Sequence, residues 1–251
     1  MIRLLKAVFS VLLISSVALA GDLTITMNSH GKGPMGSGSS GVQMHYYSSK
    51  FMRMNDATNQ RDTLMDYGTM TSYTIDHKKK LIQKMRFEDA IDAMNSMPSE
   101  GKESMSQMMA MMFGDPNNFK VTEEGKDTVA GRSCTKYKIM VGKLVMEMSN
   151  DLSLKMPMPE ASYQKMIKMR GAMMAAVPSG KAFVRLYEEM SKIKGLTLKS
   201  HMTGMMGMDV STEATAVKEG PIPASVFVLP AGYKMEDMGA KLKAEMAKQH
   251  H

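Results

Sequence analysis

Methionine is the residue with the widest chemical scope in this chain and supplies 33 of its 251 residues. Its thioether is a flexible apolar filler, a soft ligand for Cu(I) and a target of oxidation to the sulfoxide. Met105, Met108, Met109 and Met112 fall at i, i+3, i+4 and i+7, so they share one face of an expected helix. That face suits a core, a lid over an apolar ligand, or a Cu(I) site, and the sequence leaves all three open.

Further methionine clusters have spacings that also suit copper. They are Met156-Pro157-Met158 and His201-Met202 with Met205, Met206 and Met208. Methionine is, however, spread over nearly every expected element, whereas a dedicated metal centre concentrates its ligands. We therefore predict neither a metal site nor a cofactor.

No motif for catalysis is present: the chain lacks H-E-x-x-H, G-x-S-x-G and a P-loop. Gly36-x-Gly38-x-x-Gly41 formally matches a dinucleotide-binding fingerprint, but that motif requires a helix directly after it. The following residues, 42–47, alternate as a strand does. We interpret the glycines as a flexible loop between strands and predict that the protein is not an enzyme.

The first 20 residues are typical of a secretory signal peptide. Arg3 and Lys6 precede an apolar run, and Ala18-Leu19-Ala20 is a cleavage site of the A-x-A type, so the mature chain is expected to begin at Gly21. The predicted location is periplasmic or secreted. Cys134 is the only cysteine, which excludes an internal disulfide, and we expect a small buried side chain.

The basic residues give a net charge of +7 but form no long stripe with interleaved aromatics, so nucleic-acid binding is not expected. Lys78-Lys79-Lys80 is the only basic run. We interpret it as a solvated hairpin turn, with peripheral contact to anionic lipid headgroups as the alternative.

Alternating apolar residues predict antiparallel strands in the first half and in the last third of the chain, and helical periodicity predicts helices between them. Expected strands lie at 23–27, 42–46, 52–54, 63–67, 70–76, 81–85, 119–123, 135–148 (a pair), 196–203 and 210–216. Helices are expected near 87–94, 105–112, 159–174 and 183–190, with a short one at 237–248. The order predicts an α+β protein with a single domain at 21–235, followed by a C-terminal helix and tail at 236–251.

Several segments resemble one family of exported bacterial proteins, the domain of unknown function 4412. The most distinctive is the segment from Gly220 to Lys234, and the others agree with it in order. They are Arg53-Met54, Asp62 to Asp66, Asp76 to Lys80 and Gly131 to Tyr137. That family is similar to the outer-membrane lipoprotein carriers. The resemblance implies a strongly curved, incomplete antiparallel barrel with helices over its concave face and a cavity for acyl chains between them.

The resemblance and the adaptable methionine side chains together predict a non-enzymatic binder of an apolar ligand, such as a lipid or a lipoprotein acyl chain. The expected ligand-binding residues are Met52, Met54, Met105, Met108, Met109, Met112, Leu198 and Met202. The alternative is a methionine-rich protein that binds Cu(I) or buffers oxidants. The sequence leaves the ligand and the oligomeric state open.

Overall fold

The computed structural model describes residues 21–32, 40–113, 118–175, 180–204 and 207–249. The predicted leader and most of the glycine-rich loop, Gly36 and Gly38 included, lie outside these residues. A strand, β2, begins at Gly41, so the predicted strand directly after the glycines is confirmed.

Twelve strands form one sheet in the order β12-β6-β5-β4-β3-β2-β1-β11-β10-β9-β8-β7. Their bounds are β1 Leu23–Lys32, β2 Gly41–Tyr47, β3 Phe51–Asp56, β4 Arg61–Asp66, β5 Thr71–Asp76, β6 Leu81–Arg86, β7 Phe119–Val129, β8 Arg132–Val141, β9 Leu144–Asp151, β10 Leu196–Thr203, β11 Asp209–Glu219 and β12 Lys234–Asp237. The strands predicted from alternation are all present.

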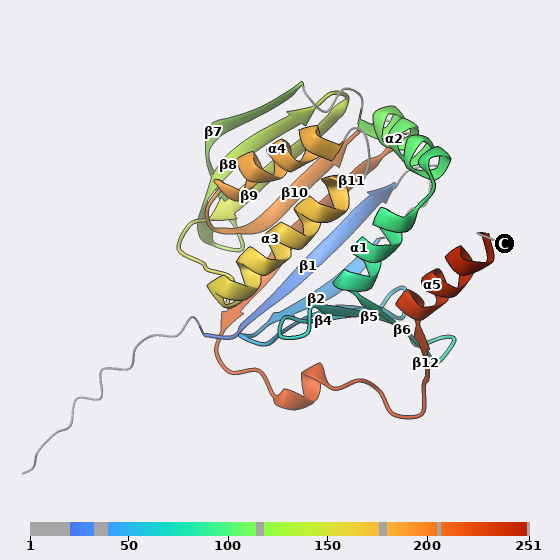
Figure 1. Ribbon diagram of the computed structural model, residues 1–251. Helices are drawn as coiled ribbons and strands as arrows, with labels where there is room; N and C mark the ends of the chain where they lie inside the picture. The colour runs from blue at the N-terminus through green and yellow to red at the C-terminus, as the bar shows by residue number, and fades with distance from the viewer. Residues whose placement is uncertain (1–20, 33–39, 114–117, 176–179, 205–206, 250–251) are drawn as a thin grey trace, which may run out of the picture.

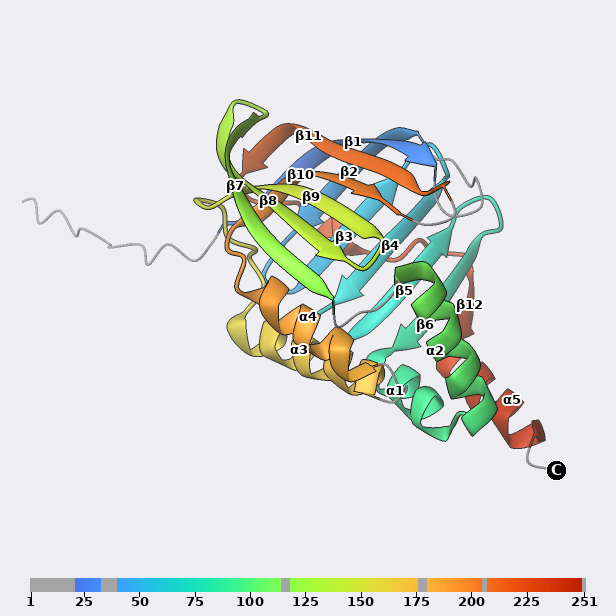
Figure 2. The same cartoon turned by 90° about the horizontal axis from the view of Figure 1, so that it is seen from above.

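Four helices are inserted between strands and a fifth ends the described chain. They are α1 Phe87–Ser96, α2 Ser99–Phe113, α3 Glu160–Ala175, α4 Gly180–Ser191 and α5 Met238–Gln249, and a 3-10 turn, η3, spans Ala224–Phe227. The sheet is curled without closing, and α1 to α4 lie over its concave side (Figures 1 and 2). The predicted α+β class and half-barrel architecture are confirmed.

One edge of the sheet departs from the antiparallel expectation. Strand β12, which the sequence did not predict, pairs with β6 in parallel, with Lys234 opposite Leu81. The physical reason is the route of the chain: residues 220–233, here called the strap, cross the convex side of the sheet to its far edge (Figure 1). A short strand arriving there from outside satisfies the backbone groups of β6, whatever its direction.

Three hairpins in the first half share one turn design, repeated every ten residues. Asp56, Asp66 and Asp76 each end a strand, and each carboxylate accepts hydrogen bonds from backbone amides two or three residues later, at 2.8–3.2 Å. The fourth turn residue, Gln60, Met70 or Lys80, then adopts a left-handed φ of 47–52°. This side-chain capping sets the register of β3 to β6.

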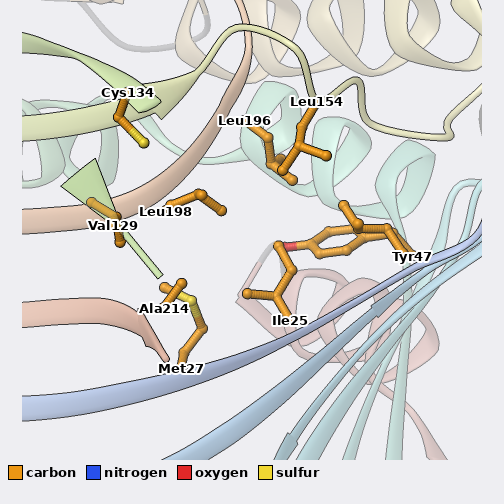
Figure 3. Packing of buried hydrophobic residues seen from close by; sticks show 10 residues of the cluster. Ile25, Met27, Tyr47, Val129, Cys134, Leu154, Leu196, Leu198 and Ala214 are labelled. Carbon is orange, nitrogen blue, oxygen red and sulfur yellow. The ribbon is translucent and has the colours of Figure 1, made fainter. Parts of the chain in front are cut away.

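The main core lies on the concave face of β1, β2, β10 and β11. It contains Leu23, Ile25, Met27, Tyr47, Val129, Cys134, Leu154, Leu196, Leu198 and Ala214 (Figure 3). Cys134 is 1% exposed, which confirms the prediction of a buried small side chain. Burial also raises the pKa of its thiol, so the reactive thiolate is disfavoured.

Candidate functional site: an apolar cavity beneath the helices

A cavity of about 460 Å³ lies between the concave face of β3 to β5 and the helices α1, α3 and α4. Its lining comes from three strands, the turn after β4, the loop before α3 and three helices. The lining residues are Met52, Thr63, Met65, Tyr67, Ser72, Phe87, Met156, Met158, Tyr163, Met166, Ile167, Arg170, Met190 and Ser191.

No helix within the described residues is long and apolar enough to span a membrane.

Strand register places the floor residues side by side. Met52 on β3 lies opposite Met65 on β4, which lies opposite Ser72 on β5, so all three share the concave face. Residues paired in this way have neighbouring side chains. The floor is therefore fixed by the sheet rather than by a loop.

Helix α3 supplies the roof. Tyr163, Met166, Ile167 and Arg170 follow the spacing i, i+3, i+4, i+7, which is one helical face. Met169, also on α3, forms a buried cluster with Met65, Tyr67 and Met70 of the sheet side. Half-buried Met52, Phe87, Met158 and Met166 pack against this cluster. Unbranched thioether chains repack readily around different shapes, so this lining suits an apolar ligand of loose shape.

The cavity wall contains one unsatisfied polar group. Tyr67 is 2% exposed, and its hydroxyl has no hydrogen-bond partner among the described residues. Leaving a buried hydroxyl unpaired costs about 1–3 kcal/mol. Burial, with a smaller contribution from the nearby Tyr47 phenol, raises the pKa of Tyr67, so its hydroxyl stays protonated.

Tyr47, beside it, already has a partner. Its hydroxyl lies 3.3 Å from His45 Nδ1, and His45 Nε2 lies 3.3 Å from Gln43 Oε1. Burial raises the pKa of Tyr47 to about 12 and lowers the pKa of His45, so both groups are neutral near pH 7. Among the described residues, no hydrogen bond joins this series to the Tyr67 hydroxyl.

The cavity continues into a wider groove at the end of the sheet. The two share Met156, Met158 and Tyr163, and the groove has a volume of about 1010 Å³. Lys155 and Lys194 lie along it and form no ion pair within the described part of the chain. The cavity and the groove together form an apolar interior that is open to solvent at one end.

Of the residues predicted to bind ligand, Met52 lines the cavity. Met54 lies on the concave face beside it, opposite Thr63, which is a lining residue. Met109 and Met202 pack instead against a second buried cluster formed by Ile139, Val141 and Leu144. That cluster belongs to the other half of the sheet.

The remaining predicted residues lie in different surroundings. Leu198 is fully buried in the main core, Met108 is 50% exposed on α2, and Met105 is half-buried on the same helix. The side chain of Met112 lies outside the described residues. The expected ligand set is thus distributed over several environments, and its role stays a prediction.

Sequence reasoning missed Met65, Tyr67 and Ser72 as lining residues. The ten-residue spacing of Asp56, Asp66 and Asp76 was the available signal, because it fixes the hairpins and so the register that brings Met65 and Ser72 opposite each other. The methionine pair at 156 and 158, considered for copper, lines the cavity and the groove.

The second set of candidate copper ligands, His201 and the methionines that follow it, lies in different surroundings. His201 Nε2 lies 2.9 Å from Asp209 Oδ1 at the surface, and Met205 and Met206 lie outside the described residues. No group of three or more His, Cys, Asp or Glu side chains suited to a metal occurs in the described part of the chain.

Four of the five segments that carry the family resemblance meet on the convex face, opposite the cavity, whereas Gly131 to Tyr137 lies in the β7–β8 hairpin at the other edge of the sheet. Asp62 is 1% exposed and accepts hydrogen bonds from Arg53 and from Asn55, while His77 Nε2 lies 3.1 Å from it. Arg53 also donates to two carbonyl oxygens of the strap, those of Val226 at 2.6 Å and Val228 at 3.1 Å. This polar cluster holds the strap in place.

Apolar contacts complete the attachment of the strap. Phe227, Leu229 and Tyr233 pack against Leu64, Ile75 and Ile82, and the Phe227 ring stacks on Phe51 at 5.5 Å. His77 Nδ1 lies 3.0 Å from the Tyr233 hydroxyl. The most distinctive sequence motif is therefore structural, and the cavity lies on the other face of the same strands.

The basic run Lys78-Lys79-Lys80 lies in the turn between β5 and β6, as predicted, and its three side chains are exposed. Lys79 Nζ lies 3.9 Å from Asp76 Oδ2, a weak surface pair. Contact with lipid headgroups stays a prediction.

A curled, unclosed sheet with helices over its concave side defines a half-barrel, and here the half-barrel contains an apolar cavity. Residues 35–233 match the family Domain of unknown function (DUF4412), and the chain belongs to this family. The resemblance stated from the sequence motifs is confirmed. Among curated proteins, no sequence matches the chain.

Similar solved structures include an uncharacterized conserved protein from Thermus thermophilus, with a TM-score of 0.46 and 8% identity over 87% of this chain and 91% of that one. The MucA/MucB complex of Pseudomonas aeruginosa gives a TM-score of 0.42 and 11% identity, over 85% of this chain and 57% of that one. A domain described as a putative outer membrane lipoprotein-sorting protein, from Vibrio parahaemolyticus, gives 0.32 and 10% identity, over 83% and 89%.

Proposed function

We propose that the protein is an exported, non-enzymatic binder of an apolar ligand, such as a lipid or a lipoprotein acyl chain. The observation that carries the proposal is the cavity of about 460 Å³ between the concave sheet face and α1, α3 and α4. Ligand pockets typically measure about 300–1,000 Å³ and are mostly apolar with a few polar groups. Export rests on the predicted leader.

The composition of the lining supports an aliphatic ligand. Six of the lining side chains are methionine: Met52, Met65, Met156, Met158, Met166 and Met190. Thioether chains adapt to a flexible alkyl chain without a fixed shape, and burial of each methylene contributes about 0.8 kcal/mol. The adjoining groove gives such a chain an entry and a place for its polar end.

Native mass spectrometry of the mature protein, purified gently from the periplasm, tests the proposal. The wild type is expected to retain a mass adduct that fragments to acyl chains. Met166→Lys places a charge in the cavity roof and should abolish the adduct, because an unpaired buried charge is costly.

Met109→Lys is the matched control, since Met109 is also a half-buried helical methionine but packs against the cluster in β8 and β9. If the ligand lies beneath α3, this variant should retain the adduct, whereas its loss would favour the Met105–Met112 face expected from the sequence. Circular dichroism must show both variants folded. A bare wild-type mass, or equal retention by Met166→Lys, would contradict the proposal.

A specific observation also favours the oxidant-buffering alternative. Met108 and Met111 on α2 are 50% and 55% exposed, and Met235 is 51% exposed. Hypochlorite transfers one oxygen to a thioether and is itself reduced to chloride, so exposed methionines should become sulfoxides first. Peptide mapping after limiting hypochlorite would refute this role if buried Met27 and Met70 oxidised equally fast.

A further inference from the structure

We infer that the cavity prefers alkyl chains that end in a carbonyl group over plain hydrocarbons. The Tyr67 hydroxyl would donate a hydrogen bond to that carbonyl oxygen. This inference rests on the proposed function and deepens it. It distinguishes a lipid or fatty acid, whose chain ends in a carbonyl, from a plain hydrocarbon. Tyr67 is thereby assigned as a specificity-determining residue.

The position of Tyr67 carries the inference. It follows β4 directly, lines the cavity and is packed among Met65, Met70 and Met169. Its hydroxyl is the only buried oxygen of the cavity lining without a hydrogen-bond partner among the described residues. Buried hydroxyls are normally paired, so an unpaired one on a residue that lines a cavity is available to a ligand atom that reaches it.

The neighbouring groups leave this bond to the ligand. The Tyr47 hydroxyl lies 3.3 Å from His45 Nδ1, and no hydrogen bond joins it to the Tyr67 hydroxyl among the described residues. The raised pKa of Tyr67 keeps its proton in place, which makes the hydroxyl a donor. Thioethers are weak acceptors and move at low cost, so an entering chain can displace one and reach the hydroxyl.

The polar groups around Tyr67 agree with a carbonyl ligand. Thr63 and Ser72 add two more hydroxyl groups to the cavity lining. Arg170 lies on the same lining and forms no ion pair in the described part of the chain. A carbonyl can therefore come from an esterified chain or from a free carboxylate, and the second would also attract Arg170.

Competition binding with a fluorescent acyl probe tests the inference. Methyl decanoate and tridecane are matched competitors with the same number of non-hydrogen atoms, one with a carbonyl and one without. Tyr67→Phe should weaken methyl decanoate about tenfold relative to tridecane, the loss expected for one hydrogen bond of about 1.4 kcal/mol. Tyr163→Phe is the control, because Tyr163 also lines the cavity but is half-buried.

The outcomes separate the inference from the proposed function. If the wild type binds both competitors and Tyr67→Phe leaves their ratio unchanged, the role of Tyr67 is refuted while the cavity remains a binding site. If the wild type binds neither, the proposed function fails. Thermal unfolding should show Tyr67→Phe at least as stable as the wild type, since it removes only an unpaired hydroxyl.

Decanoate in place of its methyl ester identifies the source of the carbonyl. Tighter binding of decanoate that Arg170→Gln abolishes would indicate a free fatty acid. Equal binding of acid and ester would indicate an esterified chain of a lipid or lipidated protein. Both results keep the dependence on Tyr67, and a loss of that dependence with both competitors would overturn the inference.

Discussion

Replacement of Arg53 by methionine should destabilise the protein strongly without emptying the cavity. Arg53 is 12% exposed and Asp62 is 1% exposed, so the substitution leaves a carboxylate buried without its guanidinium. Breaking a buried ion pair from one side costs about 3–5 kcal/mol. Asn55 and His77 stay within 2.9 and 3.1 Å of Asp62 and offset part of this cost.

The strap adds to the loss. Two hydrogen bonds from Arg53 to the carbonyl oxygens of Val226 and Val228 disappear, each worth about 1 kcal/mol. If these two lost hydrogen bonds balance the part that Asn55 and His77 offset, the net loss in the free energy of unfolding is about 3–5 kcal/mol, a large share of the roughly 5–15 kcal/mol of a typical domain. Urea unfolding followed by circular dichroism measures it.

Two further variants make this prediction refutable. Arg61→Met, on the neighbouring strand, breaks an exposed pair with Asp76 at 3.4 Å and should cost less than about 1 kcal/mol. The double variant Arg53→Met/Asp62→Leu should recover part of the stability, because no charge is left buried. A loss below about 1 kcal/mol for Arg53→Met, or a double variant less stable than the single one, would refute the reasoning.

Other predictions address the turns, the C-terminal helix and the thiol. Gln60→Gly should raise the unfolding temperature by about 2–4 °C, because the left-handed φ of 52° strains a side chain by about 1 kcal/mol; no gain in calorimetry would contradict this. Hydrogen bonds from Arg86 and Lys243 lower the pKa of Asp89 to about 2, from an ordinary 3.8. A lowered pKa stabilises above the ordinary value, so the stability difference between the wild type and Asp89→Asn should shrink as the pH falls from about 4 to 2, and a constant difference in acid titrations would count against it. Gly239→Val should detach α5 from α1, since an added Cβ would lie 2.5 Å from Asp89 Oδ2, with faster proteolysis of the C-terminus as the readout. Cys134 should react with a thiol reagent only on unfolding, and rapid labelling of the native protein would refute its burial.

Much of the fold follows from the sequence because sheets and helices have different periods. Alternation around Met52 and Met54 indicated a strand, and the i, i+3, i+4 spacing of Met105, Met108 and Met109 indicated a helix, as found. The strand β12 was missed because four residues, Lys234–Asp237, carry too little alternation to identify.

The candidate site was less accessible to sequence reasoning. Helical spacing shows which residues share a face, but not which half of the sheet that face meets. The sequence reasoning therefore named Met109 and not Met166, yet Met109 packs on the β8–β9 cluster and Met166 lines the cavity. That choice depends on long-range contacts between α3 and the β3–β5 hairpins. Tyr67, likewise, becomes notable only once its lack of a hydrogen-bond partner among the described residues is known.

Photo-crosslinking with a diazirine-bearing fatty acid, mapped by peptide mass spectrometry, tests most directly whether the cavity beneath α3 is the binding site. The account predicts crosslinks on β3, β4 and the Tyr163–Arg170 face of α3, competed by unlabelled fatty acid and lost in Met166→Lys. Saturable crosslinks confined to α2 around Met108, unaffected by Met166→Lys, would contradict it.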